Sequence, residues 1–518
     1  MRKFLIYLLI YMQLCILHCL AQPAIQWEKS LGGTSDDIIN GITQTNDGGF
    51  IVCGQSRSQD DDVIGNHGNW DAWIVKLNTF GTLQWAKCYG GSYDDNFYSI
   101  RQANDGGYIC AGYTNSNDGD VSGNHGYDAW IIKINDIGAI QWSKCFGGSS
   151  GSSEAHSIIQ TSDGNYVFTG YTRANDGDVN GNHDTTGHYW DGWVVKLDSQ
   201  GTIIWQKCYG GTSLDGFNTI ISSSTGGYLL SGFCLSNDGD GCNNHDFGQG
   251  DFWIVKIDTI GHIQWSNCFG GNGSDEAVSV MQTLDGGYAI GGYTSTSNNA
   301  DVMCGYHSWY VLWVTKISDS GSLQWAKCYA DTIAIGGFLA PSNDSGFVII
   351  GNSSYWGAWL VKLDVGGNMN WSGRYGSTNG EEDASGIIHC NDGGYAFIAS
   401  SGGNNHDVTG HHGSPNTNRD YWVVKLAPDT AAGINEIKSS QGVSIYPNPA
   451  STSITIHLST TPQNELLLIT DVFGRVVYKE NIRANDTQVA VSNWSSGVYF
   501  YSLTQGEGAA IRGKFIKE

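Results

Sequence analysis

Polar side chains that could bind a metal ion recur in loops of similar sequence. The segments SNDGDVSGNHG (116–126), ANDGDVNGNHD (174–184) and SNDGDGCNNHD (236–246) each place an amide and two carboxylates around a glycine. Calcium takes about six to eight oxygen ligands from such groups. The predicted calcium ligands are Asn117, Asp118, Asp120, Asn175, Asp176, Asp178, Asn237, Asp238 and Asp240. The alternative is that these residues form Asx turns on their own backbone.

A histidine follows an asparagine near the end of several of these loops, at His67, His125, His183 and His245. A zinc site needs about three or four nitrogen or sulfur ligands that meet at one centre. One histidine per repeat, spread along the chain, does not provide that convergence. We therefore expect these histidines to hold their loops in place.

Patterns for catalysis are weak. Carboxylates occur in pairs before several repeats, as at Asp94 and Asp95, and glycoside hydrolysis uses two carboxyl groups about 5–9.5 Å apart. No pair is distinguished by its spacing, so the sequence predicts no catalytic residue. A noncatalytic binding or adhesion protein is the favoured interpretation, and a secreted carbohydrate-active hydrolase or lyase using these carboxylates is the alternative.

Composition limits the class of protein that must carry these loops. The 518 residues include 72 Gly and 19 Trp but only 7 Pro, which favours short strands and tight turns over long helices. The 26 Lys and Arg stand against 50 Asp and Glu, a net charge of −24. This balance argues against nucleic acid as a partner, because binding to phosphates depends on Lys and Arg.

The first 21 residues have the order of a secretory signal peptide. Arg2 and Lys3 precede an apolar run that ends at Ala21, after which we predict cleavage. No later stretch approaches the roughly 18 apolar residues that a membrane-spanning helix needs. The mature chain is thus expected to leave the cytoplasm with no membrane-spanning segment.

Eleven cysteines remain after that cleavage. Five of them stand three residues after a tryptophan in successive repeats, and we expect them to be small buried hydrophobic side chains: Cys88, Cys145, Cys208, Cys268 and Cys328. Cys234 and Cys242 lie in one loop and are the pair that we would examine for a disulfide.

Tryptophans recur in two series of seven. The first series is 27, 85, 142, 205, 265, 325 and 371, and the second is 73, 130, 193, 253, 313, 359 and 422. In the third repeat, residues 154–161, 166–172, 193–198 and 201–211 are predicted strands, which together make one four-stranded blade. The NDGG turns at 46–49, 104–107 and 391–394 are expected to be type I′ hairpin turns. The sequence therefore predicts an all-β protein whose residues 22–426 form a seven-bladed β-propeller.

The seventh repeat lacks its fourth strand. Residues 24–33, AIQWEKSLGG, have the pattern of that strand and precede the first repeat. We expect this N-terminal segment to complete the last blade and close the ring. The stretch from third to fourth strand, as in KLDSQGTIIW (196–205), resembles the repeat of pyrroloquinoline-quinone-type propellers, a likeness of packing that implies no cofactor.

A polar linker, residues 427–442, separates the propeller from a small segment of alternating apolar and polar residues. That segment, 443–518, is predicted to be an Ig-like β-sandwich. It resembles the type A C-terminal sorting domain of the type IX secretion system of Bacteroidetes. The residues that carry the resemblance are Tyr446, Pro447, Asn448, Pro449, Asp471, Gly474, Arg475, Gly497, Tyr499, Gly513, Lys514 and Phe515.

This resemblance implies passage through the periplasm and across the outer membrane. It also implies two partners, the type IX secretion machinery and its C-terminal signal peptidase, and a protein that is secreted or attached to the cell surface. The propeller repeats look like those of large secreted Bacteroidetes proteins. For the propeller itself the expected ligand is a glycan or a surface protein, with Ca²⁺ as the one cofactor considered.

Overall fold

The computed structural model describes residues 22–184, 186–241, 244–245, 249–305, 309–329, 334–353, 357–378, 381–414, 417–428, 443–446, 450–458, 465–471, 475–504 and 511–517. These residues form strands, turns and loops, with no helix among them. The chain divides into two compact units, Met1–Thr430 and Ala431–Glu518. The predicted signal peptide and most of the predicted linker lie outside the described residues.

The first unit contains seven four-stranded antiparallel sheets. Sheet 1 has β2 (Asp37–Gln44), β3 (Phe50–Ser56), β4 (Asp71–Leu77) and β5 (Leu83–Tyr89). Sheet 2 has β6 (Asp95–Gln102), β7 (Tyr108–Thr114), β8 (Asp128–Ile134) and β9 (Ile140–Phe146). Sheet 3 has β10 (Ser153–Gln160), β11 (Tyr166–Thr172), β12 (Asp191–Leu197) and β13 (Ile203–Tyr209). Sheet 4 has β14 (Asp215–Ser222), β15 (Tyr228–Cys234), β16 (Asp251–Ile257) and β17 (Ile263–Phe269).

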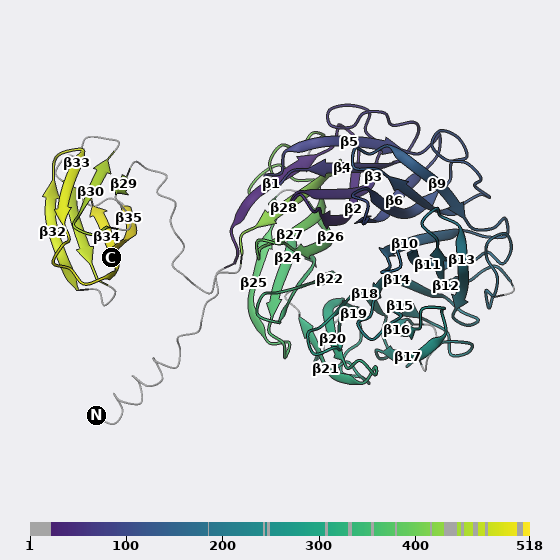
Figure 1. Cartoon of the computed structure of the whole chain (residues 1–518). Coiled ribbons are helices and arrows are strands. Elements are labelled where there is room, and N and C mark those ends of the chain that lie inside the picture. The colour runs from purple at the N-terminus through teal and green to yellow at the C-terminus, as the bar shows by residue number, and fades with distance from the viewer. Residues whose placement is uncertain are drawn as a thin grey trace, which may run out of the picture. The chain divides into compact units, whose positions relative to one another are not determined.

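The remaining sheets follow the same plan. Sheet 5 has β18 (Asp275–Gln282), β19 (Tyr288–Thr294), β20 (Val311–Ile317) and β21 (Leu323–Tyr329). Sheet 6 has β22 (Ala334–Pro341), β23 (Phe347–Ser353), β24 (Ala358–Leu363) and β25 (Met369–Tyr375). Sheet 7 has β26 (Glu382–His389), β27 (Tyr395–Ser401), β28 (Asp420–Leu426) and the N-terminal β1 (Ile25–Leu31). Figure 1 shows the sheets side by side around a common axis, with their first strands nearest to it, as expected of propeller blades.

The N-terminal strand completes the last sheet, as its sequence pattern predicted. β1 pairs with β28 in antiparallel register, with Glu28 opposite Val424 and Leu31 opposite Tyr421. Side chains reinforce the pairing, because Trp422 Nε1 donates to Glu28 Oε2 at 3.1 Å. The two ends of this unit are therefore held together by one strand pair.

Tryptophans build the contacts within and between the sheets. In the second series, all but Trp359 have no exposed surface, and Trp359 is 2% exposed. First-series tryptophans reach into the next sheet, where a Cβ added to Gly81 would lie 2.7 Å from the Trp27 ring. Trp27 Nε1 also donates to the carbonyl of Thr79 at 3.1 Å. Glycine is needed at this turn because the neighbouring ring occupies the space of a side chain.

The NDGG turns differ from the prediction. Gly48 N donates to Thr45 O at 2.8 Å and Thr45 N donates to Gly49 O at 2.9 Å. Gly48 has a φ of 79°, whereas Asn46 and Asp47 are not among the residues with positive φ. The predicted type I′ turn is therefore wrong, since it needs positive φ at both central residues. The glycine that follows the turn takes the left-handed conformation instead.

Every first strand contains a β-bulge. The register shifts at one extra residue in each of the seven sheets. These extra residues are Asn40, Tyr98, His156, Asn218, Val278, Gly337 and Ser385. A bulge leaves its residue unpaired and redirects its side chain, and here it does so on the strand nearest the axis.

The cysteine prediction is only partly right. Cys88 and Cys208 are buried thiols and Cys145 is a half-buried thiol, but Cys328 forms a disulfide with Cys304, and Cys268 is also disulfide-bonded. This disulfide joins the loop before β20 to β21, which the repeat pattern did not indicate. Cys234 is buried with its thiol 3.4 Å from the carbonyl of Ser236, and Cys242 lies outside the described residues.

The second unit has two antiparallel sheets. One contains β29 (Val443–Tyr446), β30 (Ser453–Leu458) and β33 (Asp486–Ala490). The other contains β31 (Glu465–Thr470), β32 (Val476–Ile482), β34 (Gly497–Thr504) and β35 (Ile511–Lys517). Side chains from both sheets share one hydrophobic core, which includes Ile454, Leu467 and Phe515.

Candidate functional site

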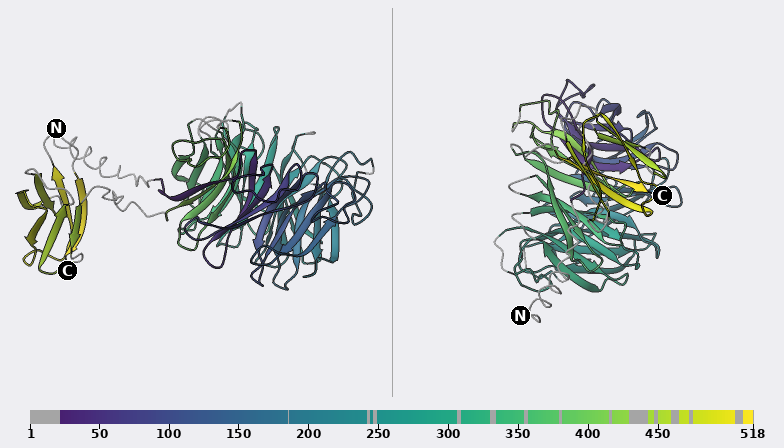
Figure 2. Two further views of the ribbon diagram at one scale, coloured as in Figure 1. Left: turned by 90° about the horizontal axis from the view of Figure 1, so that it is seen from above. Right: turned by 90° about the vertical axis from the view of Figure 1, so that its left-hand side faces the viewer.

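The predicted metal ligands lie in the loops between the second and third strands of sheets 2, 3 and 4, which we call the long loops. Figure 2 shows the first unit from two further sides, with loops at both ends of its strands. The segment that connects one sheet to the next along the chain is called the joining loop. Each long loop lies beside the joining loop that leads into its sheet.

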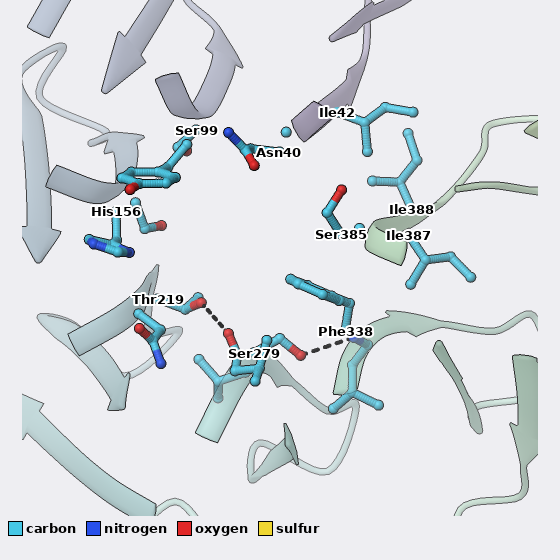
Figure 3. Close-up of a pocket in the computed structure, with 18 of the residues that line it drawn as sticks. Asn40, Ile42, Ser99, His156, Thr219, Ser279, Phe338, Ser385, Ile387 and Ile388 are labelled. Carbon is cyan, nitrogen blue, oxygen red and sulfur yellow. Dashed lines mark hydrogen bonds between the residues drawn. The ribbon is translucent and has the colours of Figure 1, made fainter. Parts of the chain in front are cut away.

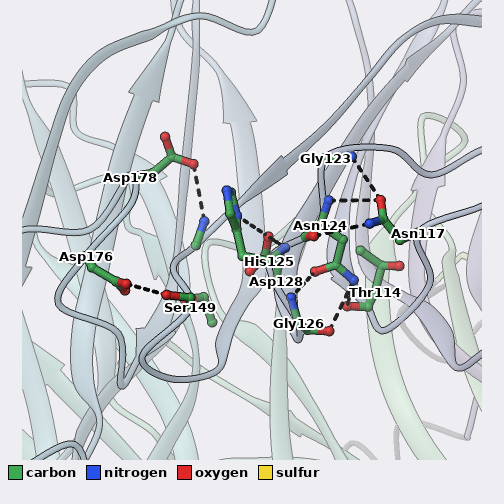
Figure 4. Close-up of polar contacts among 12 residues, drawn as sticks. Thr114, Asn117, Gly123, Asn124, His125, Gly126, Asp128, Ser149, Asp176 and Asp178 are labelled. Atoms are coloured by element: carbon green, nitrogen blue, oxygen red, sulfur yellow. Dashed lines mark hydrogen bonds and ion pairs between the residues drawn. The ribbon is translucent and has the colours of Figure 1, made fainter.

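In sheet 2 the predicted ligands are hydrogen-bond acceptors within these loops. Asn117 Oδ1 accepts from Gly123 N at 3.1 Å, which closes the long loop on itself (Figure 4). Asp118 Oδ1 accepts from Ser92 N at 2.8 Å in the joining loop. Asp120 Oδ2 lies 3.4 Å from Gly90 N. The amide and the two carboxylates thus point to different backbone groups rather than to one centre.

Sheets 3 and 4 repeat this arrangement. Asp176 accepts from Ser149 Oγ at 2.6 Å and from Ser150 N at 3.0 Å (Figure 4). Asp238 accepts from Thr212 N at 2.8 Å. The remaining predicted ligands make fewer contacts. Asn175 Oδ1 accepts from Gly181 N, Asp178 Oδ2 lies 3.4 Å from Gly147 N, Asn237 is exposed, and Asp240 Oδ2 lies 3.7 Å from His183 Nε2.

Within the part of the chain that the structure describes, no group of three or more His, Cys, Asp or Glu side chains is placed to hold a metal ion. The asparagines bond within their own loop, as the alternative interpretation expected, whereas Asp118, Asp176 and Asp238 accept from the neighbouring joining loop. Calcium binding by these loops stays a prediction.

The four predicted histidines each bond a buried aspartate at the start of a third strand. His125 Nδ1 lies 2.9 Å from Asp128 Oδ2, which also accepts from the His125 backbone N–H (Figure 4). The other pairs are His67 with Asp71, His183 with Asp191 and His245 with Asp251. These pairs anchor the end of each long loop to its sheet.

Buried carboxylates meet where two sheets join. A Cβ on Gly270 would lie 2.3 Å from Asp251 Oδ1 in sheet 4 and 2.6 Å from Asp275 Oδ2 in sheet 5. Oδ1 of Asp251 is buried and has no hydrogen-bond partner. Burial raises the pKa of Asp275 to about 6, and burial raises that of Asp37, at the junction of sheets 7 and 1, to about 7. These junctions therefore contain acids that take up protons near neutral pH.

A cavity of about 390 Å³ lies on the axis, lined by residues of the first strands. Figure 3 shows Asn40, Ser99, His156, Phe338 and Ser385 around this space. The bulge residues of sheets 1, 2, 3, 4, 5 and 7 are among its lining. The sequence reasoning missed this site, because a bulge is a feature of strand pairing that the alternation of side chains does not show.

One side of the cavity borders an aromatic cluster around a buried acid. Glu154 Oε2 lies 3.1 Å from His156 Nε2, and its Oε1 accepts from Tyr127 Oη at 3.0 Å. His156 stacks on Tyr98 with ring centroids 4.5 Å apart. Burial opposes ionisation of Glu154, but hydrogen bonds from His156 and Tyr127 hold the pKa of this carboxyl below its usual value. Glu154 is thus an ionised, fully partnered group.

The structure also places part of the predicted sorting signal. Tyr499 and Phe515 are buried, and their rings stack with centroids 5.7 Å apart. Arg475 Nε donates to Asp471 Oδ2 at 2.7 Å, Tyr446 is half exposed, and Gly497 begins β34. Gly513 and Lys514 lie in β35, whereas Pro447, Asn448, Pro449 and Gly474 lie outside the described residues.

Comparison with solved structures finds matches at low sequence identity. One is PorZ, a surface component of the type IX secretion system of Porphyromonas gingivalis, with 11% identity and a TM-score of 0.41 over 96% of this chain. This chain spans 61% of PorZ. Another is a protein of unknown function from Dyadobacter fermentans, with 8% identity and a TM-score of 0.40 over 78% of this chain and 99% of that one. No curated protein sequence matches.

The family comparison identifies the second unit. Residues 444–518 match the model of the Secretion system C-terminal sorting domain. Within the described residues no helix is long and apolar enough to cross a membrane. The chain therefore ends in a type IX secretion C-terminal sorting domain, and it is an exported protein that is secreted or attached to the outer-membrane surface.

Proposed function

We propose that the seven sheets are the blades of a seven-bladed β-propeller closed by β1, and that the second unit is a small β-sandwich. On this proposal the protein is a noncatalytic binding or adhesion module that the type IX system delivers to the cell exterior. Its ligand is a glycan or a surface protein.

The observation that carries this proposal is the axial cavity. Its lining is polar and aromatic on one side, and its ionisable groups have partners within the protein. Glu154 is bonded to His156, and Glu276 Oε1 accepts from Asn218 Nδ2 at 3.0 Å. The predicted rim carboxylates are likewise occupied as acceptors in their loops. Groups fixed in this way suit binding better than proton transfer, which needs a carboxyl that reaches its substrate.

Binding of the mature chain, residues 22–518, to arrays of bacterial and host polysaccharides tests the proposal. We expect saturable binding without release of reducing ends. Turnover of a bound polysaccharide, abolished by one rim substitution such as Asp94→Asn, would instead establish the hydrolase or lyase alternative. A chain that binds no array component and retains no surface protein in a pull-down would contradict the binding proposal.

Two further partners belong to this proposal. The sorting domain requires the type IX machinery for export, and we expect its C-terminal signal peptidase to remove the second unit.

Calcium in the long loops would raise the thermal unfolding midpoint, because a ligand at 100 times its dissociation constant stabilises a fold by ~2.7 kcal/mol. Unfolding in EDTA and then in millimolar calcium measures this effect, and an unchanged midpoint with no bound metal would count against a calcium role.

A further inference from the structure

One repeat has an arginine at a position where the other six have uncharged residues. The seventh residues of the first strands are, in chain order, Thr43, Arg101, Ile159, Ile221, Met281, Ala340 and Ile388. Packing between neighbouring sheets does not require a charge at this position, since six sheets pack without one. Arg101 therefore needs a separate explanation.

Arg101 lines the axial cavity and is half buried. Its Nη1 donates to the carbonyl of Ile100 at 2.9 Å and to Thr43 Oγ1 at 3.4 Å. Among the described residues no carboxylate pairs with the guanidinium, and its Nε and Nη2 groups have no hydrogen-bond partner. The edge that carries these two N–H groups is thus available to a ligand.

The surroundings of this charge favour an anionic ligand. Ile221 and Ile388 line the cavity at the same level of their strands, so the guanidinium has apolar neighbours. Burial lowers the pKa of Arg101, because the charged form is poorly solvated there. Glu276, an acid of the lining, is the second residue of β18, towards the opposite end of the first strands, and is bonded within the protein. An anion from outside would supply the missing counter-charge.

The geometry of the donors selects the kind of anion. The Nε–H and Nη2–H groups of an arginine lie in one plane and match the two oxygens of a carboxylate. His156 is the other basic side chain in the lining, and its Nε2 lies 3.1 Å from Glu154 Oε2. One available cation balances one negative charge, whereas a phosphate monoester would bring a second charge into the cavity. The site therefore suits a single carboxylate.

Backbone contacts on the axis argue against a peptide as the source of that carboxylate. A peptide that binds as an added strand needs free carbonyls on the inner edge of a first strand. Side chains of the neighbouring sheet already donate to several of these carbonyls at 2.6–2.9 Å, namely Thr43 to Ile100, Thr219 to Val278, Ser279 to Gly337 and Ser385 to Ile39. A compact ring that carries its own carboxylate does not need them.

From these contacts, and resting on the proposed binding function, we propose that the axial cavity binds an acidic sugar residue, with its carboxylate on the Nε and Nη2 edge of Arg101. A uronic acid is the simplest such residue. The cavity volume of about 390 Å³ is at the small end of the range for small-molecule sites, as a single sugar requires. Phe338 and Ile388 supply apolar surface for the carbon atoms of the ring (Figure 3).

Calorimetric titration of the mature chain, residues 22–518, with matched methyl glycosides tests this proposal. The pairs are glucuronic acid with glucose, galacturonic acid with galactose, and mannuronic acid with mannose. We expect at least one acidic glycoside to bind saturably and its neutral counterpart to bind at least tenfold more weakly. The methyl ester of the acidic glycoside should lose binding in the same way, because it lacks the charge.

Substitution of the arginine tests the assigned residue. Arg101→Gln should weaken binding of the acidic glycoside more than tenfold. Arg101→Lys should weaken it less, because lysine keeps the charge but not the two parallel donors. Arg57→Gln is the matched control, since it removes the same charge from an exposed residue between β3 and β4 and should leave binding unchanged. The unfolding midpoint shows whether each variant has folded, and the ester comparison serves if Arg101→Gln has not.

The inference is overturned if no acidic glycoside binds, if its ester binds equally well, or if binding survives Arg101→Gln. Binding of acetyl-Ala-Ala through its C-terminal carboxylate, or of glucose 6-sulfate, in place of the acidic sugars would also overturn it. Array binding that persists in Arg101→Gln while no acidic glycoside binds would reject the axial site but leave the proposed binding function intact. An unaltered chain that binds no array component and no surface protein would reject the proposed function itself.

Discussion

At the scale of single residues, one repeat sometimes has a different residue at a position where the other repeats agree. The NDGG turns use a glycine with positive φ, but sheet 6 has Ser345 there, with a φ of 69°. A left-handed conformation costs a residue with a Cβ about 1–2 kcal/mol relative to the right-handed one. Sheet 6 therefore contains a strained turn.

We expect Ser345→Gly to stabilise the first unit by about 1 kcal/mol, because glycine adopts this conformation without strain. Chemical denaturation measures the change. Gly106→Ser is the matched control, since Gly106 has a φ of 86° and a Cβ there would contact nothing within 4 Å. The control should lose a similar amount, and a neutral or destabilising Ser345→Gly would contradict the argument.

A second departure concerns a buried lysine. Six third strands pair their lysine with an aspartate of the first turn, as Lys316 does with Asp285 at 2.9 Å. In sheet 4, Thr225 takes the place of that aspartate, and Lys256 Nζ donates to the carbonyl of Gly226 at 2.6 Å. Burial lowers the pKa of Lys256. This lysine lacks the carboxylate that its counterparts have.

Thr225→Asp should therefore raise the unfolding free energy by about 1 kcal/mol, as a hydrogen bond between charged groups contributes about 1.5–3 kcal/mol and the nearby Asp319 opposes part of the gain. Calorimetry of the variant gives the shift. Asp285→Thr, which creates the same defect beside Lys316, is the control and should lower the midpoint. If both variants were more stable than the unaltered chain, or if neither were, the ion pair would not be what determines stability at this position.

At the scale of elements, the junctions between sheets link stability to pH. The folded-state pKa of Asp37 is about 7 and those of Asp95 and Asp275 are about 6, each raised mainly by burial from 3.8. The folded state consequently binds protons more tightly than the unfolded state between pH 4 and 7. The stabilisation that these acids provide should be largest near pH 4 and fall as pH rises towards 8.

Urea unfolding at pH 5 and pH 8 measures how stability depends on pH, and we expect the higher unfolding midpoint at pH 5. Asp47, whose pKa is lowered to about 2 through its bonds to Thr45 and Lys76, loses its contribution only below pH 4 and does not interfere. Asp275→Asn should flatten the slope, because one titrating junction is removed. Equal midpoints, or a higher one at pH 8, would contradict the buried-acid explanation.

The pairing of β1 with β28 makes a separate prediction for an element. Deletion of residues 22–33 should lower the midpoint by more than about 10 °C, since it removes a whole strand ladder and exposes an edge. A synthetic peptide of residues 22–33 should restore most of the loss. A truncated chain as stable as the full one would mean that the pairing contributes little.

At the scale of the whole molecule, the sorting domain determines where the protein goes. A chain that ends at residue 443 should accumulate in the periplasm of a Bacteroidetes host, as measured by fractionation and surface protease treatment. A reporter placed between residues 1–21 and residues 427–518 should reach the exterior. Surface display of the truncated chain, or retention of the reporter, would contradict the assignment.

Much of this architecture was predictable because it depends on repetition. Two tryptophan series, the alternation of strand residues and the N-terminal AIQWEKSLGG segment indicated the sheets and the β1 pairing. The bulges were not predictable, because Asn40 or His156 occupies an ordinary place in the alternation until strand pairing is known. The N-D-G-D loops show the opposite difficulty, since the same oxygen atoms can bind a cation or accept backbone hydrogen bonds.

The strand pair that joins the two ends of the first unit also decides how the protein bears load. β28 has hydrogen-bonded neighbours on both sides, β27 and β1, and the chain leaves it towards the sorting domain. A force applied along β28 at its C-terminal end would shear both of these ladders at once rather than peel one edge strand. We therefore expect the strand pair that closes the first unit also to resist extension from the C-terminal side.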